Sequence, residues 1–318
     1  MEWLLQFWDG LVITLAQSLI APMLDHLHLT NLSENPHDIA AYFLLSAIQI
    51  SLIAGIMRPL ETLLPAETWA NRQLTRIDRL YTLLKLLVVV PAVNYLIVAP
   101  LFHTAAGNKP AAPLQLGHLM PFLQSHPLGL FLIYLALYDF TLYLVHRLQH
   151  ALPWWWGLHS LHHSQRQLSC WSNDRDHYLD DLIEVLILGG VSAIIGIAPV
   201  EYAAIVLCGQ LIENFSHANV RIGFGPILDK VLVNPKYHRL HHMRADPTRP
   251  GFHNCNFALI FPVWDILFGT ALYKEPPHPC GVDDPSIDAD NERGLLSQQM
   301  AGLRRFAAGF KRRASSTT

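Results

Sequence analysis

The chain has 318 residues, of which 51% are hydrophobic and only 15% are charged, and its formal net charge is −3. An apolar excess of this size indicates a membrane protein rather than a soluble globular one. The near-neutral charge gives no electrostatic reason to expect a nucleic-acid partner.

Four apolar stretches approach the roughly 20 residues that cross a bilayer, and we predict a transmembrane helix in each. They are residues 3–24, 39–57, 80–102 and 128–145. The first stretch has neither a basic start nor a small-residue cleavage site, so we expect no removed signal peptide. A fifth region, 182–211, is apolar, but we expect it to be interrupted at Gly189-Gly190 and by Pro199 after Gly196. It predicts a re-entrant or shallow hairpin, or two short tilted helices.

The distribution of basic residues predicts the orientation. The loop after the second stretch carries four arginines: Arg58, Arg72, Arg76 and Arg79. Residues 25–38 have no Lys or Arg, and residues 103–127 have only Lys109. The positive-inside rule then places the arginine-rich loop, both termini and the end of the fourth stretch in the cytoplasm. Further on, we expect a cytosolic cap with short helices at 234–268 and an amphipathic surface helix at 295–311.

Histidine is unusually abundant, with eighteen residues, and three clusters have helical spacing. They are His146 and His150; His159, His162 and His163; and His238, His241 and His242. Positions three or four apart share one face of a helix, so each cluster presents several imidazoles together. A lone histidine is more often a surface or core residue, but three such clusters indicate a metal site. Imidazole suits Fe, Zn, Cu and Ni, so these ligands do not select the metal.

Residues near the clusters have competing interpretations. Asp139 lies near the inner end of the fourth stretch, where an unpaired charge is costly. It could bind a ligating imidazole and fix its tautomer, or snorkel to the interface. We expect Trp154, Trp155 and Trp156 to form an interfacial belt. Arg147 and Arg239 are predicted to meet solvent or headgroups. The remaining histidines lack the spacing and lie in predicted loops: His26, His28, His37, His103, His118, His126 and His278, with His253 left undecided.

The order of motifs resembles the fatty acid hydroxylase superfamily, which includes sterol desaturases. The chain reads D-x-x-x-Y-x-x-H-R-x-x-H from Asp139 to His150 and W-x-x-H-x-x-H-H from Trp156 to His163. Asn234-Pro235-Lys236-Tyr237 leads into the third cluster, and Trp264-Asp265-Ile266-Leu267-Phe268-Gly269-Thr270 follows it. The resemblance covers roughly residues 128–273. It implies an all-α integral membrane protein with about four transmembrane helices and a cytosolic helical cap that carries the histidine boxes.

This resemblance also implies a di-iron centre. The expected ligands are the eight clustered histidines, His146, His150, His159, His162, His163, His238, His241 and His242, with His217 added by its motif position. His177 matches the family's Arg-x-His position and is expected either to bind metal or to support a ligand. Glu213 stands where some relatives have another histidine, so its carboxylate could bind or support the metal. Asn256 lies in a segment, 254–258, that departs from the usual pattern, and with Asp139 it is expected to support the ligands. The domain expectation is membrane spans in 1–127, a catalytic domain in 128–273 and an irregular tail with a surface helix in 274–318.

The implied reaction is hydroxylation of a lipid C–H bond by O₂, with two iron ions as cofactors and zinc as a substitute in purified protein. No nicotinamide, flavin or haem motif is present, so we expect a separate donor such as a ferredoxin, cytochrome or reductase. The family favours a bacterial inner membrane. Alternatives are a desaturase on the same site, a histidine-rich metal transporter, or a non-catalytic metal-stabilised membrane protein. A transporter would need ionisable residues inside several spans, and the first three have almost none. The sequence specifies neither the lipid nor the oligomeric state.

Overall fold

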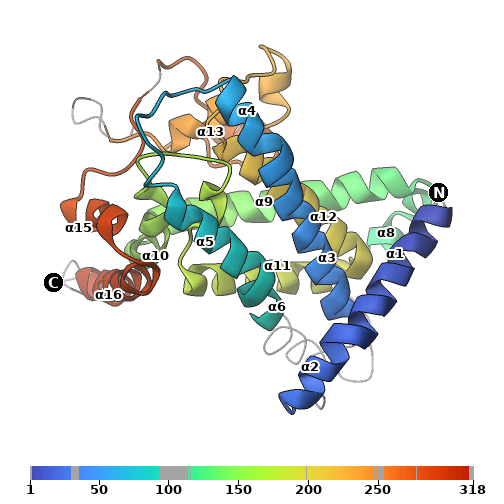
Figure 1. Cartoon of the computed structure of the whole chain (residues 1–318). Coiled ribbons are helices and arrows are strands. Elements are labelled where there is room, and N and C mark those ends of the chain that lie inside the picture. The colour runs from blue at the N-terminus through green and yellow to red at the C-terminus, as the bar shows by residue number, and fades with distance from the viewer. Residues whose placement is uncertain are drawn as a thin grey trace.

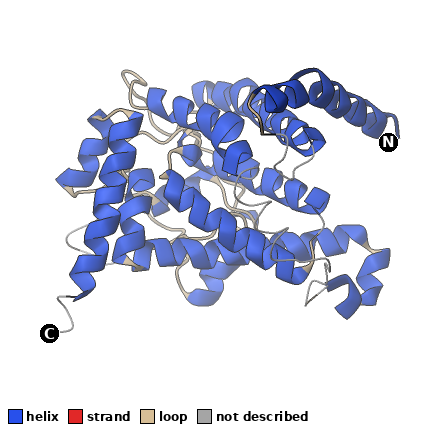
Figure 2. Ribbon diagram, turned by 90° about the horizontal axis from the view of Figure 1, so that it is seen from below, coloured by secondary structure: helices blue, strands red, loops and turns tan. Residues whose placement is uncertain are grey.

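The computed structural model of the chain describes residues 2–29, 36–93, 114, 116–197, 199–245, 248, 254–276 and 278–314. Throughout these residues the regular structure is helical, with two isolated β-bridges and no strand (Figure 2). The all-α prediction is therefore confirmed for this part of the chain.

Within the described residues, three helices are long and apolar enough to cross a membrane: Gln6–His26, Pro36–Leu63 and Pro127–Ala151. The first comprises α1 (Glu2–Leu15), η1 (Ala16–Ile20) and α2 (Ala21–His26). The second comprises α3 (Pro36–Leu52), η2 (Ile53–Met57) and α4 (Arg58–Leu63), and the third is α9 (Pro127–Ala151). The apolar window of α9 is 39% buried, against 22% for the other two, so α9 is the innermost of the three.

The third predicted span coincides with α5 (Arg76–Leu84), η3 (Lys85–Val89) and α6 (Val90–Val93), and residues 94–102 lie outside the described part. Lys85 is buried in this stretch. Its ammonium lies 2.9 Å from Asp176 and 2.8 Å from Asp181. The stretch is therefore fixed to the histidine-rich half of the chain by buried ion pairs.

The fifth apolar region forms two helices, α11 (Tyr178–Ile195) and α12 (Pro199–His217). The predicted interruption at Gly189-Gly190 is wrong, because both glycines lie inside α11. The helix ends instead at Gly196, which has a φ of 74°. Glycine accepts this left-handed conformation without a steric penalty. Both helices contact α9, and Leu135, Leu188 and Ile205 belong to their shared core.

Apart from α16, the other helices are short, and several lie near the C-terminal end of α9. In Figure 1, α9 runs across the molecule from the side of α8 (Leu116–Leu119) to α10 (Pro153–His163). The remaining elements are η5 (Pro121–Ser125), η6 (Ser172–Asp174), η7 (Leu228–Lys230), α13 (Pro235–His241), α14 (Val263–Phe268), α15 (Pro285–Asp288), η8 (Ala289–Glu292) and α16 (Leu295–Ala314). The third histidine cluster begins at α13, where the Asn234 side chain accepts from the Tyr237 N–H and Pro235 occupies the first turn. Both features favour helix initiation at that point.

Helix α16 confirms the predicted helix at 295–311, but it is more than a surface element. It packs along α10, and the two helices approach closely at Gly157 of α10 and at Gly309 of α16. A Cβ on Gly157 would lie 2.5 Å from the Phe306 nitrogen. The ring of Trp154 stacks on Phe310 with centroids 5.5 Å apart, and Trp155 is buried. The predicted interfacial belt is therefore wrong for Trp155, which packs inside the protein, whereas Trp154 is half-buried against α16.

Candidate metal centre

Four helices bring the histidines of the three clusters together. His146 and His150 lie in the last two turns of α9, and the second cluster ends α10. The third cluster occupies α13 and its C-cap, and His217 ends α12. Helical spacing puts the imidazoles of each cluster on one face, and the packing of the helices turns these faces toward one another.

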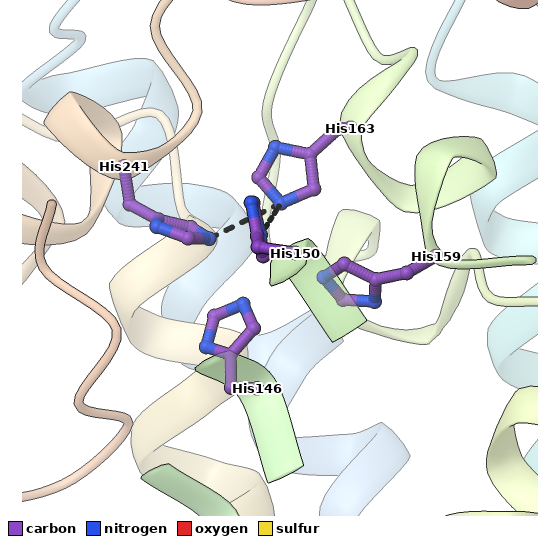
Figure 3. Close-up of side chains that lie close together, drawn as sticks. All are labelled: His146, His150, His159, His163 and His241. Atoms are coloured by element: carbon purple, nitrogen blue, oxygen red, sulfur yellow. Dashed lines mark hydrogen bonds between the residues drawn. The ribbon is translucent and has the colours of Figure 1, made fainter. Parts of the chain in front are cut away.

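The converging histidines form two groups whose ligand atoms lie within 4.8 Å of one another. The first group is His146, His150, His159, His163 and His241, and Figure 3 shows these rings around a common centre. The second is His162, His217, His238 and His242. Eight of the nine side chains are buried and His150 is half-buried. The nine therefore comprise the eight clustered histidines and His217.

In the second and third clusters, the two consecutive histidines belong to different groups. His162 belongs to the second group and His163 to the first, and His241 and His242 divide in the same way. The rings of His163 and His242 stack at 4.4 Å with an angle of 17°. The two groups therefore contact each other through these stacked rings, and this arrangement is suited to two metal ions side by side.

Hydrogen bonds fix the tautomer of three of these histidines. The Nδ1 atoms of His146, His241 and His217 each lie 2.8 Å from a backbone carbonyl oxygen, respectively that of Phe257, Cys255 and Glu213. A carbonyl oxygen can only accept, so Nδ1 must carry the proton. In the neutral imidazole, Nε2 is then a bare lone pair.

The bare Nε2 atoms lie beside other imidazole nitrogens. The Nε2 of His217 is 3.0 Å from the Nε2 atoms of His162 and His238, and the Nε2 of His241 is 3.1 Å from that of His163. The third of these rings, His146, has a buried Nε2 with no partner. Because neutral imidazoles whose nitrogens converge are good metal donors, the residues of both groups fit a metal ion.

Burial also keeps the candidate ligands neutral. It holds the pKa of His163, His238 and His242 well below the ordinary histidine range, because the protonated ring would be taken out of water. Neighbouring histidines lower the pKa further. Neutral imidazole is the form that binds metal.

Two aspartates that the sequence reasoning missed support the second cluster. Asp176 places a carboxylate oxygen 3.1 Å from the Nδ1 of His162, and Asp180 places one 3.3 Å from the Nδ1 of His159. Asp180 also accepts from Gln149 and from the indole N–H of Trp155. A carboxylate behind a ligating imidazole orients the ring and raises its basicity. Their sequence signal is the acidic pattern D-x-x-x-D-D at residues 176–181, which begins thirteen residues after His163.

The carbonyls of Cys255 and Phe257 are themselves held in place. Asn256, between them, has a φ of 56° and donates from its amide to the carbonyls of Tyr237 and Leu272. Asp265 accepts from the Phe257 N–H at 2.9 Å. The predicted supporting role of Asn256 therefore has a geometric basis, through backbone groups rather than through direct contact with a histidine.

The other predicted supporting residues lie differently. Asp139 does not bond an imidazole; its carboxylate accepts from the N–H groups of Ile260 and Phe261 and from the indole of Trp264. It is fully buried, so snorkelling to the interface is wrong as well. Glu213 supports His217 through its backbone carbonyl, and its side chain is not part of either histidine group.

His177 lies apart from both groups. It caps α11, where its Nδ1 accepts from the Leu179 N–H, and its Nε2 donates to the Gln299 carbonyl at 2.8 Å. Both ring nitrogens are therefore already used.

Arg239, predicted to meet solvent or headgroups, is buried and donates to Glu67 at 2.8 Å and to Asn219 at 3.1 Å. The guanidinium of Arg147 lies over the rings of Tyr143 and Phe268. Both His103 and His253 are outside the described residues.

Comparison with known proteins gives a consistent picture. Residues 131–270 match the model of the fatty acid hydroxylase family. The chain is 32% identical to the ornithine lipid hydroxylase OlsE of Rhizobium tropici, over 52% of this chain and 47% of that protein. It is 29% identical to alkylglycerol monooxygenase of Caenorhabditis elegans, over 47% of this chain and 27% of that protein, and 28% identical to the Homo sapiens protein of that name, over 42% and 28%. The chain thus spans half or less of these relatives, and no solved structure matches it.

Proposed function

We propose that this protein is a membrane di-iron oxygenase that hydroxylates an unactivated C–H bond of a lipid, because residues 131–270 match the model of the fatty acid hydroxylase family. The observation that carries the proposal is the pair of adjacent histidine groups with bare, convergent Nε2 atoms. Two iron ions held there would supply the activation of dioxygen, with two electrons from an external donor.

Each part of the protein has a defined task in this proposal. Nine histidines hold the metal, and we include His217 but not His177 because of the hydrogen bonds described above. Asp176 and Asp180 orient His162 and His159. The backbone carbonyls of Cys255 and Phe257 orient one histidine each. Burial keeps water from the centre, which strengthens every electrostatic interaction within it.

The donor set of each group would suit iron or zinc, because imidazole binds both metals. The match to the fatty acid hydroxylase family supports iron.

The names of the relatives support a lipid substrate with a polar headgroup. Ornithine lipid and alkylglycerol are both amphiphiles, and these relatives are named hydroxylase or monooxygenase rather than desaturase. We therefore rank hydroxylation above desaturation on the same centre.

For the membrane arrangement we propose about four spans, with the histidines, the N-terminus and the C-terminus at the cytoplasmic face. A bacterial inner membrane and a separate ferredoxin, cytochrome or reductase complete the proposal. The three apolar helices and the arginine-rich loop support this topology. Residues 1–127, 128–273 and 274–318 remain our proposed division into spans, catalytic domain and tail.

The test compares the intact protein with His162→Ala and His241→Ala, one from each group, and with His26→Ala as an exposed control. Each is produced with a working electron donor, its iron is measured, and total lipids are compared by mass spectrometry. We expect a lipid that gains one oxygen only with the intact protein and the control. Loss of two hydrogens would instead indicate desaturation. Tightly bound zinc and no oxygen-dependent product would overturn the proposal in favour of a metal-stabilised, non-catalytic protein.

A further inference from the structure

A cavity of about 380 Å³ lies at the end of the second apolar helix. Its lining comes from η2 and α4, from the loop that follows α4 and from the start of α5. Four of its described lining residues are arginines: Arg58, Arg72, Arg76 and Arg79. The same lining contains no histidine and no carboxylate. The cavity is therefore separate from the metal centre and strongly positive.

The charge of these arginines is only partly balanced. One buried carboxylate, Glu61, accepts from Arg72 at 2.7 Å and lies 3.9 Å from Arg58. Glu61 also accepts from the backbone N–H groups of Cys170 and Asn219, so its charge is shared with the backbone. Within the described part of the chain, no hydrogen bond or ion pair holds the guanidinium of the other two arginines, Arg76 and Arg79. Three positive charges thus remain without a counter-charge.

The start of α5 adds to the positive potential. Arg76 and Arg79 are three residues apart on this helix, a spacing at which like charges repel. The helix begins at Arg76, so the positive end of its dipole lies at the same place. Its N-cap, Thr75, makes no capping hydrogen bond with its side chain, because the hydroxyl donates to the Arg72 carbonyl. An anion in the cavity would offset all of these charges.

Neutral donors complete the lining. Trp171 belongs to it and is only 8% exposed, yet its indole N–H has no hydrogen-bond partner among the described residues. An indole N–H can only donate, and leaving it unpaired when buried costs free energy. The side-chain oxygen of Asn71 accepts from the Gln73 N–H, which leaves its amide N–H groups as donors. A lining of guanidinium, indole and amide donors fits an oxyanion with several acceptor oxygens, and phosphate is the anion that arginine binds best in this way.

The positive-inside rule explains why arginines occur in this loop, but not why they converge. Arginines that only fix the topology can extend separately into water. Here they share one cavity with a buried indole whose N–H has no partner. This convergence indicates a binding site.

The position of the cavity indicates that the phosphate belongs to a lipid. Ala54 and Arg58 line it near the C-terminal end of the apolar helix Pro36–Leu63. Exposed apolar side chains are close to the lining residues in the sequence, with Ile56 54% exposed and Leu80 45% exposed. A phospholipid needs apolar surface for its acyl chains next to the site of its phosphate, whereas a soluble phosphate compound does not.

We propose that this cavity binds the phosphate of an anionic phospholipid, with Arg76 and Arg79 as its main charged contacts and Trp171 as a neutral donor. The acyl chains lie on the exposed apolar surface next to the cavity. Because no carboxylate lines the cavity, a zwitterionic headgroup would bring its ammonium group among the arginines, where like charges repel. The bound lipid joins the end of α4 to the start of α5 and stabilises the fold by mass action.

The experiment uses the full-length protein in a non-ionic detergent, after removal of co-purified lipid. Phosphatidylglycerol is titrated into it and compared with phosphatidylcholine and diacylglycerol of the same chain length, and with glycerol phosphate as a soluble phosphate. Lipid bound per chain is counted by mass spectrometry, and the unfolding temperature is followed. Arg76→Gln, Arg79→Gln and Trp171→Phe are compared with Arg304→Gln, which changes an exposed arginine of α16 outside this lining.

We expect one phosphatidylglycerol per chain and a higher unfolding temperature when it is bound. Arg76→Gln and Arg79→Gln should each weaken its binding about tenfold, as the loss of a charge-assisted hydrogen bond does. Trp171→Phe should weaken it less, and Arg304→Gln should have no effect. Without lipid, Arg76→Gln and Arg79→Gln should unfold at the temperature of the unchanged protein or slightly above it, because each removes one of two like charges. Weaker binding would then not result from loss of the fold.

Three results would overturn the proposal. Equal binding of phosphatidylcholine or diacylglycerol would mean that the apolar surface binds lipid without the arginines. Glycerol phosphate bound as tightly as phosphatidylglycerol would assign the cavity to a soluble phosphate compound. Unchanged lipid binding in both arginine variants would reduce these arginines to their role in topology. Because the lining contains no candidate metal ligand, the outcome does not depend on the proposed oxygenase activity.

Discussion

Adding one methyl group at Gly157 should weaken metal binding, although Gly157 is not a candidate ligand. Gly157 lies in α10, the helix of the second histidine cluster, and faces α16. An added Cβ would meet the Phe306 nitrogen at 2.5 Å and the Arg305 carbonyl carbon at 2.6 Å. Both are backbone atoms, so no side-chain rotation can relieve the contact. Helix α16 would have to move away from α10.

The expected magnitude follows from two opposing effects. Replacing a helical glycine by alanine stabilises a helix by up to about 1 kcal/mol, whereas overpacking a close contact costs about 1–3 kcal/mol. Gly190, inside α11, has no atom within 4 Å of a built Cβ. Gly190→Ala should therefore show the gain alone. The two variants should differ in free energy of unfolding by about 1–3 kcal/mol.

Thermal unfolding in detergent, with the metal content of each sample, measures the difference. At roughly 2–4 °C per kcal/mol, Gly157→Ala should unfold several degrees below Gly190→Ala and should lose metal more readily to a chelator. If Gly157→Ala instead unfolds at the same temperature as Gly190→Ala and keeps its metal, the close packing of α16 on α10 is not what holds the second cluster in place.

Three further predictions address the supporting residues. Asp180→Asn should weaken metal binding about 10- to 100-fold, measured by competition with a chelator; unchanged affinity would mean that its bond to His159 does not orient the ring. His177→Ala should leave the metal content unchanged while lowering stability by about 1–2 kcal/mol, through loss of a helix cap and one hydrogen bond; a loss of one metal equivalent would instead make His177 a ligand. Asn256→Ala should cost about 2–4 kcal/mol in unfolding experiments, from strain at positive φ and from lost buried hydrogen bonds. Asn256→Gly should cost less because it removes only the hydrogen bonds, and an equal cost would contradict the contribution of strain.

The ligands could be predicted from the sequence because their geometry is local. Histidines three and four residues apart share a helix face whatever the helix packs against. The groups behind the ligands are not local. Asp180 reaches His159 across a turn between helices, and His146 bonds a carbonyl 111 residues further along the chain. No spacing rule relates such pairs, so only the fold reveals them.

Errors in the predicted elements have similar causes. Gly189-Gly190 suggested a break, but glycine is tolerated within a helix and ends one only where the chain takes a left-handed turn, as at Gly196. The tryptophans suggested a lipid interface because amphipathic rings are common there. Gly157 lies in the same helix as these tryptophans, α10, and its lack of a side chain lets α16 pack against that helix. It was the overlooked signal that protein covers this face of α10.

The division of each doubled histidine between the two groups couples their loading with metal. His162 and His163 are joined by one peptide bond, as are His241 and His242, so the backbone of one site is also the backbone of the other. An ion that fixes one ring of a doubled histidine also restrains the backbone that carries the other ring, which reduces the entropic cost of binding the second ion. Metal titration should therefore be cooperative, with few molecules holding a single ion. If the two groups hold the iron ions proposed above, this arrangement would keep half-filled centres rare.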